Sequence, residues 1–220
     1  MKSIIVTGGT KGIGRAIVDK FAQEQYQVFT CARSEDESLK GISNVHFFKA
    51  DLSQRNEVLA FADFVRQHTE SVDILVNNTG FFIPGQIHNE EEGTLEAMIE
   101  TNVYSAYHLT RQFVNKMIEM RSGHIFNICS TASITAYTNG GSYCISKFAL
   151  LGMSKVLREE LKPFNVRVTS ILPGATLTNS WAGVDLPTER FMRSEDVAEV
   201  IWTAHKMPAS TVLEEILLRP

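Results

Sequence analysis

The stretch Lys2-Ser3-Ile4-Ile5-Val6-Thr7-Gly8-Gly9-Thr10-Lys11-Gly12-Ile13-Gly14 decides the fold of this chain of 220 residues. Its first half is a short β-branched run, which predicts a buried strand, and its glycines predict a tight turn. The amphipathic stretch 15–25 that follows predicts a helix. This order of strand, turn and helix can hold a dinucleotide, because glycines let the backbone approach a pyrophosphate and the first helical turn offers it unpaired N–H groups.

Strands and helices continue to alternate along the rest of the chain. Such alternation is typical of right-handed crossovers, which build a parallel sheet with helices on both faces. We therefore expect an α/β fold with one doubly wound parallel sheet, in a single domain over residues 1–220. The further strands are expected at 27–31, 45–50, 74–77, 124–129, 166–172 and 211–217, and the further helices at 53–68, 94–120, 143–163 and 194–206.

The composition is that of an ordinary globular protein. Hydrophobic residues make up 44% of the chain, charged residues 21%, and the net charge of −4 is not gathered in one block, which gives no indication of a nucleic-acid partner. The first apolar run is too short for a signal peptide and no segment has the length of a membrane span, so we expect a cytoplasmic protein without a membrane partner. Cys31, Cys129 and Cys144 lack the spacing of a metal or redox pair and are expected to be reduced, buried thiols; the histidines are scattered, and no metal is expected.

Residues typical of turns and of ligand contacts follow the first six expected strands. Ligands of open parallel sheets bind outside the carboxyl ends of the strands, so these residues predict a binding site at that edge. Each of them alone would be ordinary turn chemistry. They are Thr7 with the glycines, Ala32-Arg33, Asp51-Leu52, Asn77-Asn78-Thr79-Gly80, Ser130-Thr131 and Pro173-Gly174.

The charge after the second strand indicates which dinucleotide is bound. An Asp or Glu there would accept a ribose 2′-hydroxyl, whereas a 2′-phosphate requires a cation. Arg33 occupies this place and Lys11 adds a cation in the glycine loop, while Glu35 and Asp36 lie slightly further on. This pattern favours NADP(H) over NAD(H). The alternative is that Arg33 is a solvated charge at the end of the strand.

Tyr143 and Lys147 stand four residues apart at the start of an expected helix, so both project from one face. A free tyrosine hydroxyl has a pKa of about 10. A fixed ammonium close by favours the phenolate, which would let the pair act as general acid or base near neutrality. The isolated Tyr-x-x-x-Lys pattern is also compatible with a packed tyrosine and a solvated lysine.

With the glycine loop and the Tyr143/Lys147 pair together, the chain resembles the short-chain dehydrogenase/reductase family over nearly its whole length. Asn77-Asn78-Thr79-Gly80 resembles the Asn-Asn-Ala-Gly motif of that family, with threonine in place of the usual alanine. The resemblance implies a Rossmann fold and an NADP(H)-dependent oxidoreductase that acts on CH–OH or C=O groups. The cofactor-binding residues that it implies are Thr7, Gly8, Thr10, Lys11, Gly12, Ile13, Gly14, Arg33, Asp51, Leu52, Asn78, Gly80, Tyr143, Lys147, Pro173, Gly174 and Thr178.

The same resemblance implies a catalytic tetrad of Asn102, Ser130, Tyr143 and Lys147. Ser130 would donate a hydrogen bond to the substrate oxygen as charge develops on it, and Tyr143 would deliver or remove the proton. Lys147 would stabilise the phenolate and bind the nicotinamide ribose. Asn102, together with Lys147, would hold a water that relays protons to solvent.

The substrate is poorly specified by the sequence. The segment 179–193, in the place of the family's substrate-covering helices, is short and predicts a modest lid over an open pocket. The acidic run 89–92 reads as a solvated helix start. The candidate residues for an apolar pocket wall are Phe81, Phe82, Ile134, Tyr137 and Trp181.

Three functions are compatible with these residues. The favoured one is an NADP(H)-dependent reductase of a small or medium carbonyl compound, reversible to the secondary alcohol. A narrower alternative is a 3-oxoacyl-(acyl-carrier-protein) reductase, because Arg121 resembles one basic residue that docks an acidic carrier protein in such enzymes. Pro163 stands near the second docking place, with Lys162 beside it, which weakens this alternative. The third is a non-catalytic regulator that senses the nucleotide with the same fold, which a complete tetrad argues against.

The resemblance also implies a homodimer or homotetramer, because the equivalent long helices of the family pair across a subunit interface. Here these are the expected helices 94–120 and 143–163, which are apolar on more than one face. The alternative is that both helices pack only on their own sheet.

Overall fold

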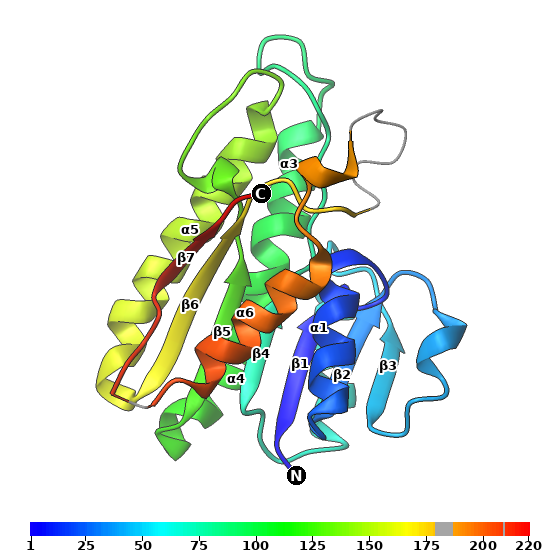
Figure 1. Ribbon diagram of the computed structural model, residues 1–220, viewed down its shortest axis with the longest axis vertical. Coiled ribbons are helices and arrows are strands. Elements are labelled where there is room, and N and C mark those ends of the chain that lie inside the picture. Colours follow the sequence, from blue (N-terminus) through cyan, green and yellow to red (C-terminus); the bar gives the residue numbers. More distant parts are fainter. Residues whose placement is uncertain (179–186, 209) are drawn as a thin grey trace.

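The computed structural model describes residues 1–178, 187–208 and 210–220 (Figure 1). The strands in these ranges are β1 (Ser3–Thr7), β2 (Gln27–Ala32), β3 (Val45–Lys49), β4 (Ile74–Asn77), β5 (Gly123–Ile128), β6 (Val166–Pro173) and β7 (Glu215–Leu218). They form one sheet in the order β3-β2-β1-β4-β5-β6-β7, in which every neighbouring pair is parallel. The strand order reverses between β1 and β4, which is where open parallel sheets hold their ligands.

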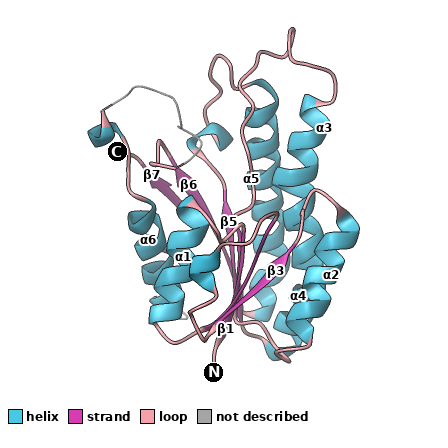
Figure 2. Ribbon diagram, turned by 90° about the vertical axis from the view of Figure 1, so that its right-hand side faces the viewer, coloured by secondary structure: helices cyan, strands magenta, loops and turns pink. Residues whose placement is uncertain are grey.

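Helices cover both faces of this sheet, as Figure 2 shows from the side. On one face lie α1 (Gly12–Gln23) and α6 (Ser194–Lys206); on the other lie α2 (Arg55–Arg66), α4 (Ser105–Met120) and α5 (Gly141–Leu161). This is the doubly wound Rossmann arrangement expected from the sequence. The shorter helical segments are η1 (Glu37–Leu39), α3 (Thr94–Ile99), η2 (Glu100–Tyr104), η3 (Thr131–Ser133), η4 (Lys162–Phe164) and η6 (Thr188–Arg190).

The side chains of β1 divide the core into two layers. Ile4 and Val6 pack with α1 and α6, while Ile5 between them packs with α2 and α4, and all three are fully buried. Burying each such side chain stabilises the fold by about 1.5 to 3 kcal/mol. A strand buried on both faces reads as a continuous apolar run, which made β1 recognisable in the sequence. None of the helices in the described ranges is both long and apolar enough to cross a bilayer.

The expected helix 94–120 is divided in the structure. It consists of α3, the π-helical segment η2 and α4, which follow one another without a loop. Hydrophobic periodicity near 3.6 residues predicts the helical stretch but does not reveal one wider turn inside it. Wider turns of this kind often occur at functional sites, and Asn102 lies within this one.

The expected last strand, 211–217, begins later than its sequence indicates. The Thr211 N–H closes a turn on the Pro208 carbonyl, and the Leu213 carbonyl accepts a hydrogen bond from the Thr169 hydroxyl. These contacts withdraw residues 211–213 from the ladder, so β7 begins at Glu215. The other expected boundaries differ from the observed ones by only a few residues.

Candidate functional site

A cavity of about 1540 Å³ opens at the carboxyl edge of the sheet, where the turn residues predicted it. It is lined by residues that follow β1, β2, β3, β4, β5 and β6. Two expected site residues, Thr7 and Asn102, do not line it. The expected site residues that do are Gly8, Thr10, Lys11, Gly12, Ile13, Gly14, Arg33, Asp51, Leu52, Asn78, Gly80, Ser130, Tyr143, Lys147, Pro173, Gly174 and Thr178.

The glycine loop between β1 and α1 is shaped by its lack of side chains. Gly8 and Gly12 have φ values of +69° and +53°, in the left-handed region that favours glycine. A Cβ on Gly14 would overlap the Gly8 carbonyl oxygen. The N-terminus of α1 lies at the cavity, and no side chain caps it. Its first N–H groups are therefore available to an anion.

Thr7 holds the loop from behind the cavity wall. Its hydroxyl is buried and accepts hydrogen bonds from the N–H groups of Asn78 and Thr79, each at 2.9 Å. The Asn78 amide in turn donates to the Thr7 carbonyl at 2.8 Å. These contacts tie the carboxyl ends of β1 and β4 together at the point where the strand order reverses. Thr79, which stands in place of the usual alanine, lines the cavity, and its N–H still donates to the Thr7 hydroxyl.

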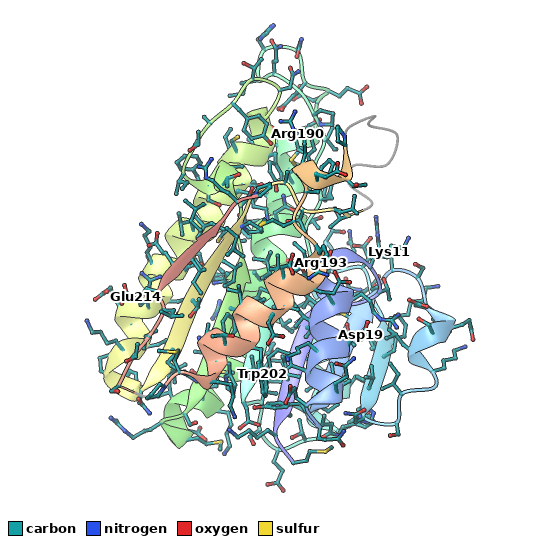
Figure 3. All side chains as sticks on the ribbon, in the orientation of Figure 1. Lys11, Asp19, Arg190, Arg193, Trp202 and Glu214 are labelled. Atoms are coloured by element: carbon teal, nitrogen blue, oxygen red, sulfur yellow. The ribbon has the colours of Figure 1, made fainter. Side chains whose placement is uncertain are left out.

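Arg33 lies at the cavity and has no carboxylate partner among the described residues. The same holds for Lys11, which Figure 3 labels at the turn before α1. The two acidic residues beyond Arg33 have other partners. Asp36 forms an ion pair with Arg15 at 2.8 Å, and hydrogen bonds from Ser38, followed by Arg15, lower its pKa. Glu35 pairs with Lys40. The structure therefore resolves the ambiguity of these acidic neighbours and leaves a positive charge at the end of β2.

Arg55 also lines this part of the cavity and was missed from the sequence. It is the first residue of α2, where a cation is electrostatically unfavourable because helix N-termini carry a partial positive charge. A cation just after the Asp51-Leu52 pair, at the start of an expected helix, was the signal that could have identified it. Its position adds to the positive charge near Arg33.

Tyr143 and Lys147 lie on the first two turns of α5, as their spacing predicted. Lys147 is buried, and its Nζ donates to the Ile128 carbonyl at 2.9 Å and lies 5.8 Å from the centroid of the Tyr143 ring. The ammonium is thus held in place by the end of β5. This geometry contradicts the reading of Lys147 as a solvated helix charge.

Ser130 begins the short turn η3 after β5. Its hydroxyl oxygen accepts a hydrogen bond from the Ala132 N–H at 3.1 Å, and its own N–H donates to the Ser133 hydroxyl. This bond uses one lone pair of the oxygen and leaves the hydroxyl proton free to rotate toward the cavity. Because Ser130 lines the cavity, this proton is available to an oxygen bound there.

Asn102 lies behind the cavity wall in η2 and is 1% exposed. Its Nδ2 donates to the Phe81 carbonyl at 3.1 Å and to the Ser146 hydroxyl at 3.0 Å, and its Oδ1 accepts from the Phe81 N–H at 2.9 Å. A Cβ on Gly80 would lie 3.1 Å from Oδ1 and 3.4 Å from the Lys147 Nζ. The second lone pair of Oδ1 and the ammonium therefore border the same small space.

Three of the five expected pocket-wall residues line the cavity: Phe81, Phe82 and Tyr137. Ile134 does not, and Trp181 lies outside the described residues. Phe82 packs edge-on against Tyr143, with 4.9 Å between ring centroids. Burial raises the pKa of Tyr137 to about 12, so this second phenol of the cavity stays protonated.

The cysteines are free and buried, as expected. Burial raises the pKa of Cys31 to about 12 and also raises that of Cys129, which makes both poor nucleophiles although they line the cavity. Across the described ranges, histidine, cysteine and acidic side chains do not gather in a group of three that could hold a metal ion.

Comparison with known proteins shows which family the sequence matches. The chain matches the short chain dehydrogenase family over residues 2–187. A sepiapterin reductase of Chlorobaculum tepidum is 33% identical over 232 residues, covering 99% of this chain and 95% of the relative.

Solved structures of similar proteins share the fold over nearly the whole chain. An alcohol dehydrogenase from the archaeon Thermococcus sibiricus, complexed with 5-hydroxy-NADP, has a TM-score of 0.90 at 26% identity and covers 100% of this chain and 96% of its own. The closed form of a serine dehydrogenase complexed with NADP+ has a TM-score of 0.88 at 27% identity, with 99% and 94% covered. Because the family match covers most of the sequence, and a relative is 33% identical over nearly the whole of both chains, the chain belongs to the short chain dehydrogenase family.

Proposed function

We propose that this protein is an NADP(H)-dependent oxidoreductase that transfers hydride between the nicotinamide and a carbonyl or secondary alcohol substrate. The observation that carries the proposal is that the glycine loop and the trio of Ser130, Tyr143 and Lys147 line one cavity. Cofactor and reacting group can then meet in a fixed orientation, which accounts for a large part of the rate enhancement in bimolecular reactions.

The residues at the carboxyl edge fit a phosphorylated dinucleotide. The uncapped N-terminus of α1 would bind the pyrophosphate, and Lys11 and Arg33 would bind the 2′-phosphate, because neither is paired with a carboxylate among the described residues. The two NADP-complexed neighbours support the same choice of cofactor. NAD(H) is the less favoured cofactor, since its adenosine ribose carries no 2′-phosphate for Arg33 to bind.

We assign the chemical roles as follows, in the direction of reduction. NADPH, when bound, supplies the hydride. The Ser130 hydroxyl donates a hydrogen bond to the substrate oxygen, and Tyr143 gives that oxygen its phenolic proton. Lys147 stabilises the phenolate that remains. A water between the Lys147 ammonium and the free lone pair of Asn102 Oδ1 would then return a proton from solvent, while Pro173, Gly174 and Thr178 would seat the carboxamide.

Sepiapterin is the first carbonyl compound to test, because the relative named for its reduction aligns over nearly the whole of both chains. A spectrophotometric assay that follows NADPH at its absorbance maximum, with sepiapterin and a panel of ketones and aldehydes, checks the proposal. We expect turnover with at least one of them. NADPH binding without any turnover would favour the nucleotide-sensing regulator instead.

The 3-oxoacyl-(acyl-carrier-protein) alternative has weaker support. Arg121, its expected docking residue, ends α4 in the left-handed region and donates from its guanidinium to the Pro163 carbonyl at 3.0 Å. The Asn165 amide binds the Arg121 carbonyl in return. Arg121 therefore has a structural task in joining the ends of α4 and α5. A 3-oxoacyl thioester in the substrate panel tests this alternative directly.

We also propose a homodimer or homotetramer assembled through α4 and α5. Both helices leave large apolar side chains exposed, which include Tyr107 and Met120 on α4 and Ile145, Phe148 and Val156 on α5. Large apolar side chains left exposed on a protein surface are typical of protein interfaces when they form one patch. Light scattering coupled to size-exclusion chromatography checks the mass, and a monomer at micromolar concentration would contradict the proposal.

A further inference from the structure

The acidic run 89–92 does not begin a helix, contrary to its sequence reading. α3 starts later, at Thr94, behind Gly93, and Glu90 points instead to the beginning of α5. Its Oε1 accepts the Ser142 N–H at 2.9 Å, and its Oε2 accepts the Ser142 hydroxyl. The carboxylate thereby satisfies an N–H of the first turn of the helix that carries Tyr143.

Glycines make room for this contact on both sides. A Cβ on Gly141 would overlap the Glu90 carboxylate, and a Cβ on Gly85 would overlap the Glu90 side chain at its Cγ. The two glycines also belong to backbone segments that meet there, since the Gly141 N–H donates to the Gly85 carbonyl at 3.1 Å. The Glu90 side chain thus reaches from the β4–α3 loop (residues 78–93) past these two glycines to the N-terminus of α5.

Besides the backbone hydrogen bond between Gly141 and Gly85, two side-chain attachments hold the β4–α3 loop to α5, one helical turn apart. Near its start, Asn102 binds both backbone groups of Phe81 and donates to the Ser146 hydroxyl of α5. Near its end, Glu90 binds Ser142. Between these two attachments lies Phe82, which lines the cavity and packs against Tyr143. The distance between the reacting phenol and this wall therefore depends on both attachments.

We infer that Glu90 is a positioning residue for the reaction proposed above: its carboxylate fixes the first turn of α5 against the β4–α3 loop and so sets where Tyr143 stands relative to a bound substrate. This inference rests on the proposed function, because it concerns the same tyrosine. Glu90 itself does not line the cavity and takes no part in the chemistry. Its influence is expected mainly on substrate turnover, since its contacts are remote from the glycine loop that would hold the pyrophosphate.

The kinetic test compares Glu90→Ala and Glu90→Gln with Glu92→Ala, an exposed carboxylate of the same loop, as the matched control. We expect Glu90→Ala to lower kcat/KM for the carbonyl substrate about tenfold or more, as small misplacements of reacting groups do. The dissociation constant of NADPH should change less than twofold. Glu90→Gln should recover most of the loss, because a carboxamide oxygen still accepts the Ser142 N–H and its amide can donate to the hydroxyl. If Glu90→Ala and Glu92→Ala have equal kcat/KM, the inference is wrong.

Hydrogen exchange separates this inference from the proposed function, because it needs no substrate. Glu90→Ala should raise the exchange of peptides that contain Ser142 and Tyr143, and of the β4–α3 loop, at least tenfold relative to wild type. Glu92→Ala should leave both unchanged. Unchanged exchange in Glu90→Ala would overturn the inference even if the enzyme is active. A wild type that turns over no carbonyl compound, with raised exchange in Glu90→Ala, would overturn only the proposed function.

Discussion

The two edges of the parallel sheet both carry basic side chains, but these differ in whether the fold gives them partners. At the carboxyl edge, Lys11 and Arg33 line a cavity without carboxylate partners among the described residues. At the amino edge, Arg167 donates to the backbone carbonyls of His205 and Met207 and thereby caps the end of α6. Among the described residues, the same residue types are therefore without a carboxylate partner at one edge and complete the fold at the other.

At the amino edge, both ring nitrogens of His205 also have hydrogen-bond partners. The Arg167 guanidinium can only donate, so its contact with His205 Nδ1 at 3.4 Å makes that nitrogen the acceptor. His205 Nε2 must then carry the proton that it shares with the Tyr26 hydroxyl, 3.2 Å away. The two edges differ in that the fold gives the charge at the amino edge its partners and, among the described residues, leaves the charges at the carboxyl edge without a carboxylate. The predictions below test this distinction from either side.

The largest effect is expected at the carboxyl edge, from Tyr143→Phe. Loss of the proton donor should lower kcat by about a thousandfold, since general acid catalysis contributes about 10²–10⁴. The matched control is Tyr137→Phe, which removes another phenol of the same cavity. We expect that control to act mainly on KM, because desolvation raises the pKa of Tyr137 to about 12 and makes it a weak proton donor. Steady-state kinetics that find the two variants equally impaired would remove Tyr143 from its proposed role.

Ser130→Ala should give the next largest effect, about a hundredfold loss in kcat, the scale found for removing one donor to a developing oxyanion. The Ala132 N–H holds its oxygen in place, so only a rotation of the hydroxyl is needed before it donates. NADPH affinity, measured by fluorescence, serves as the control for a correctly folded cavity. A variant that keeps wild-type kcat would mean that the substrate oxygen lies elsewhere.

At the amino edge, the expected effect is on stability and its dependence on pH. Burial, followed by the charge of Arg167, lowers the pKa of His205 from 6.5 to about 4. The unfolded chain therefore takes up this proton first as the pH falls. The stabilisation is complete above pH 6.5 and is lost between pH 6.5 and 4, by roughly 2 to 3 kcal/mol. Urea unfolding across this range should show the loss in wild type and a flatter profile in His205→Gln; the same slope in both would assign it to other groups.

The smallest effect is expected for Arg33→Asp, which should weaken NADPH about tenfold or more while NADH changes little. Lys116→Asp, which makes the same charge change on the exposed face of α4, is the control. Fluorescence titrations of both variants with both nucleotides measure the difference. Equal weakening of NADPH and NADH by Arg33→Asp would show that Arg33 is no ligand of the 2′-phosphate.

The sequence predicted the carboxyl edge well, because its constraints are local. Glycines with positive φ, a strand buried on both faces, and the helical spacing of Tyr143 and Lys147 each leave a pattern within a few residues. The doubly wound parallel sheet, the family and the cavity at the carboxyl edge followed from these patterns, whereas the order of the strands did not. The placement of Thr7 behind the wall did not, because a side chain that faces away from the loop leaves no periodic signal.

What the sequence did not predict depends on contacts between distant residues. Glu90 looked like a solvated charge, yet it binds Ser142, 52 residues further along the chain. The wider turn at Asn102 and the late start of β7 likewise result from tertiary hydrogen bonds that compete with local propensity. The cluster around His205 combines residues of β2, β6 and α6 or their flanks, and no motif links them. Local chemistry is readable from sequence, whereas the attachments that position it are not.

The most direct test of this account is a fluorescence titration of the wild-type protein with NADPH and, separately, with NADH. Lys11 and Arg33, which have no carboxylate partner among the described residues, predict that NADPH binds at least tenfold more tightly, which corresponds to about 1.4 kcal/mol. Binding of neither nucleotide, or of both with equal affinity, would contradict the claim that these cations form the site of a 2′-phosphorylated dinucleotide.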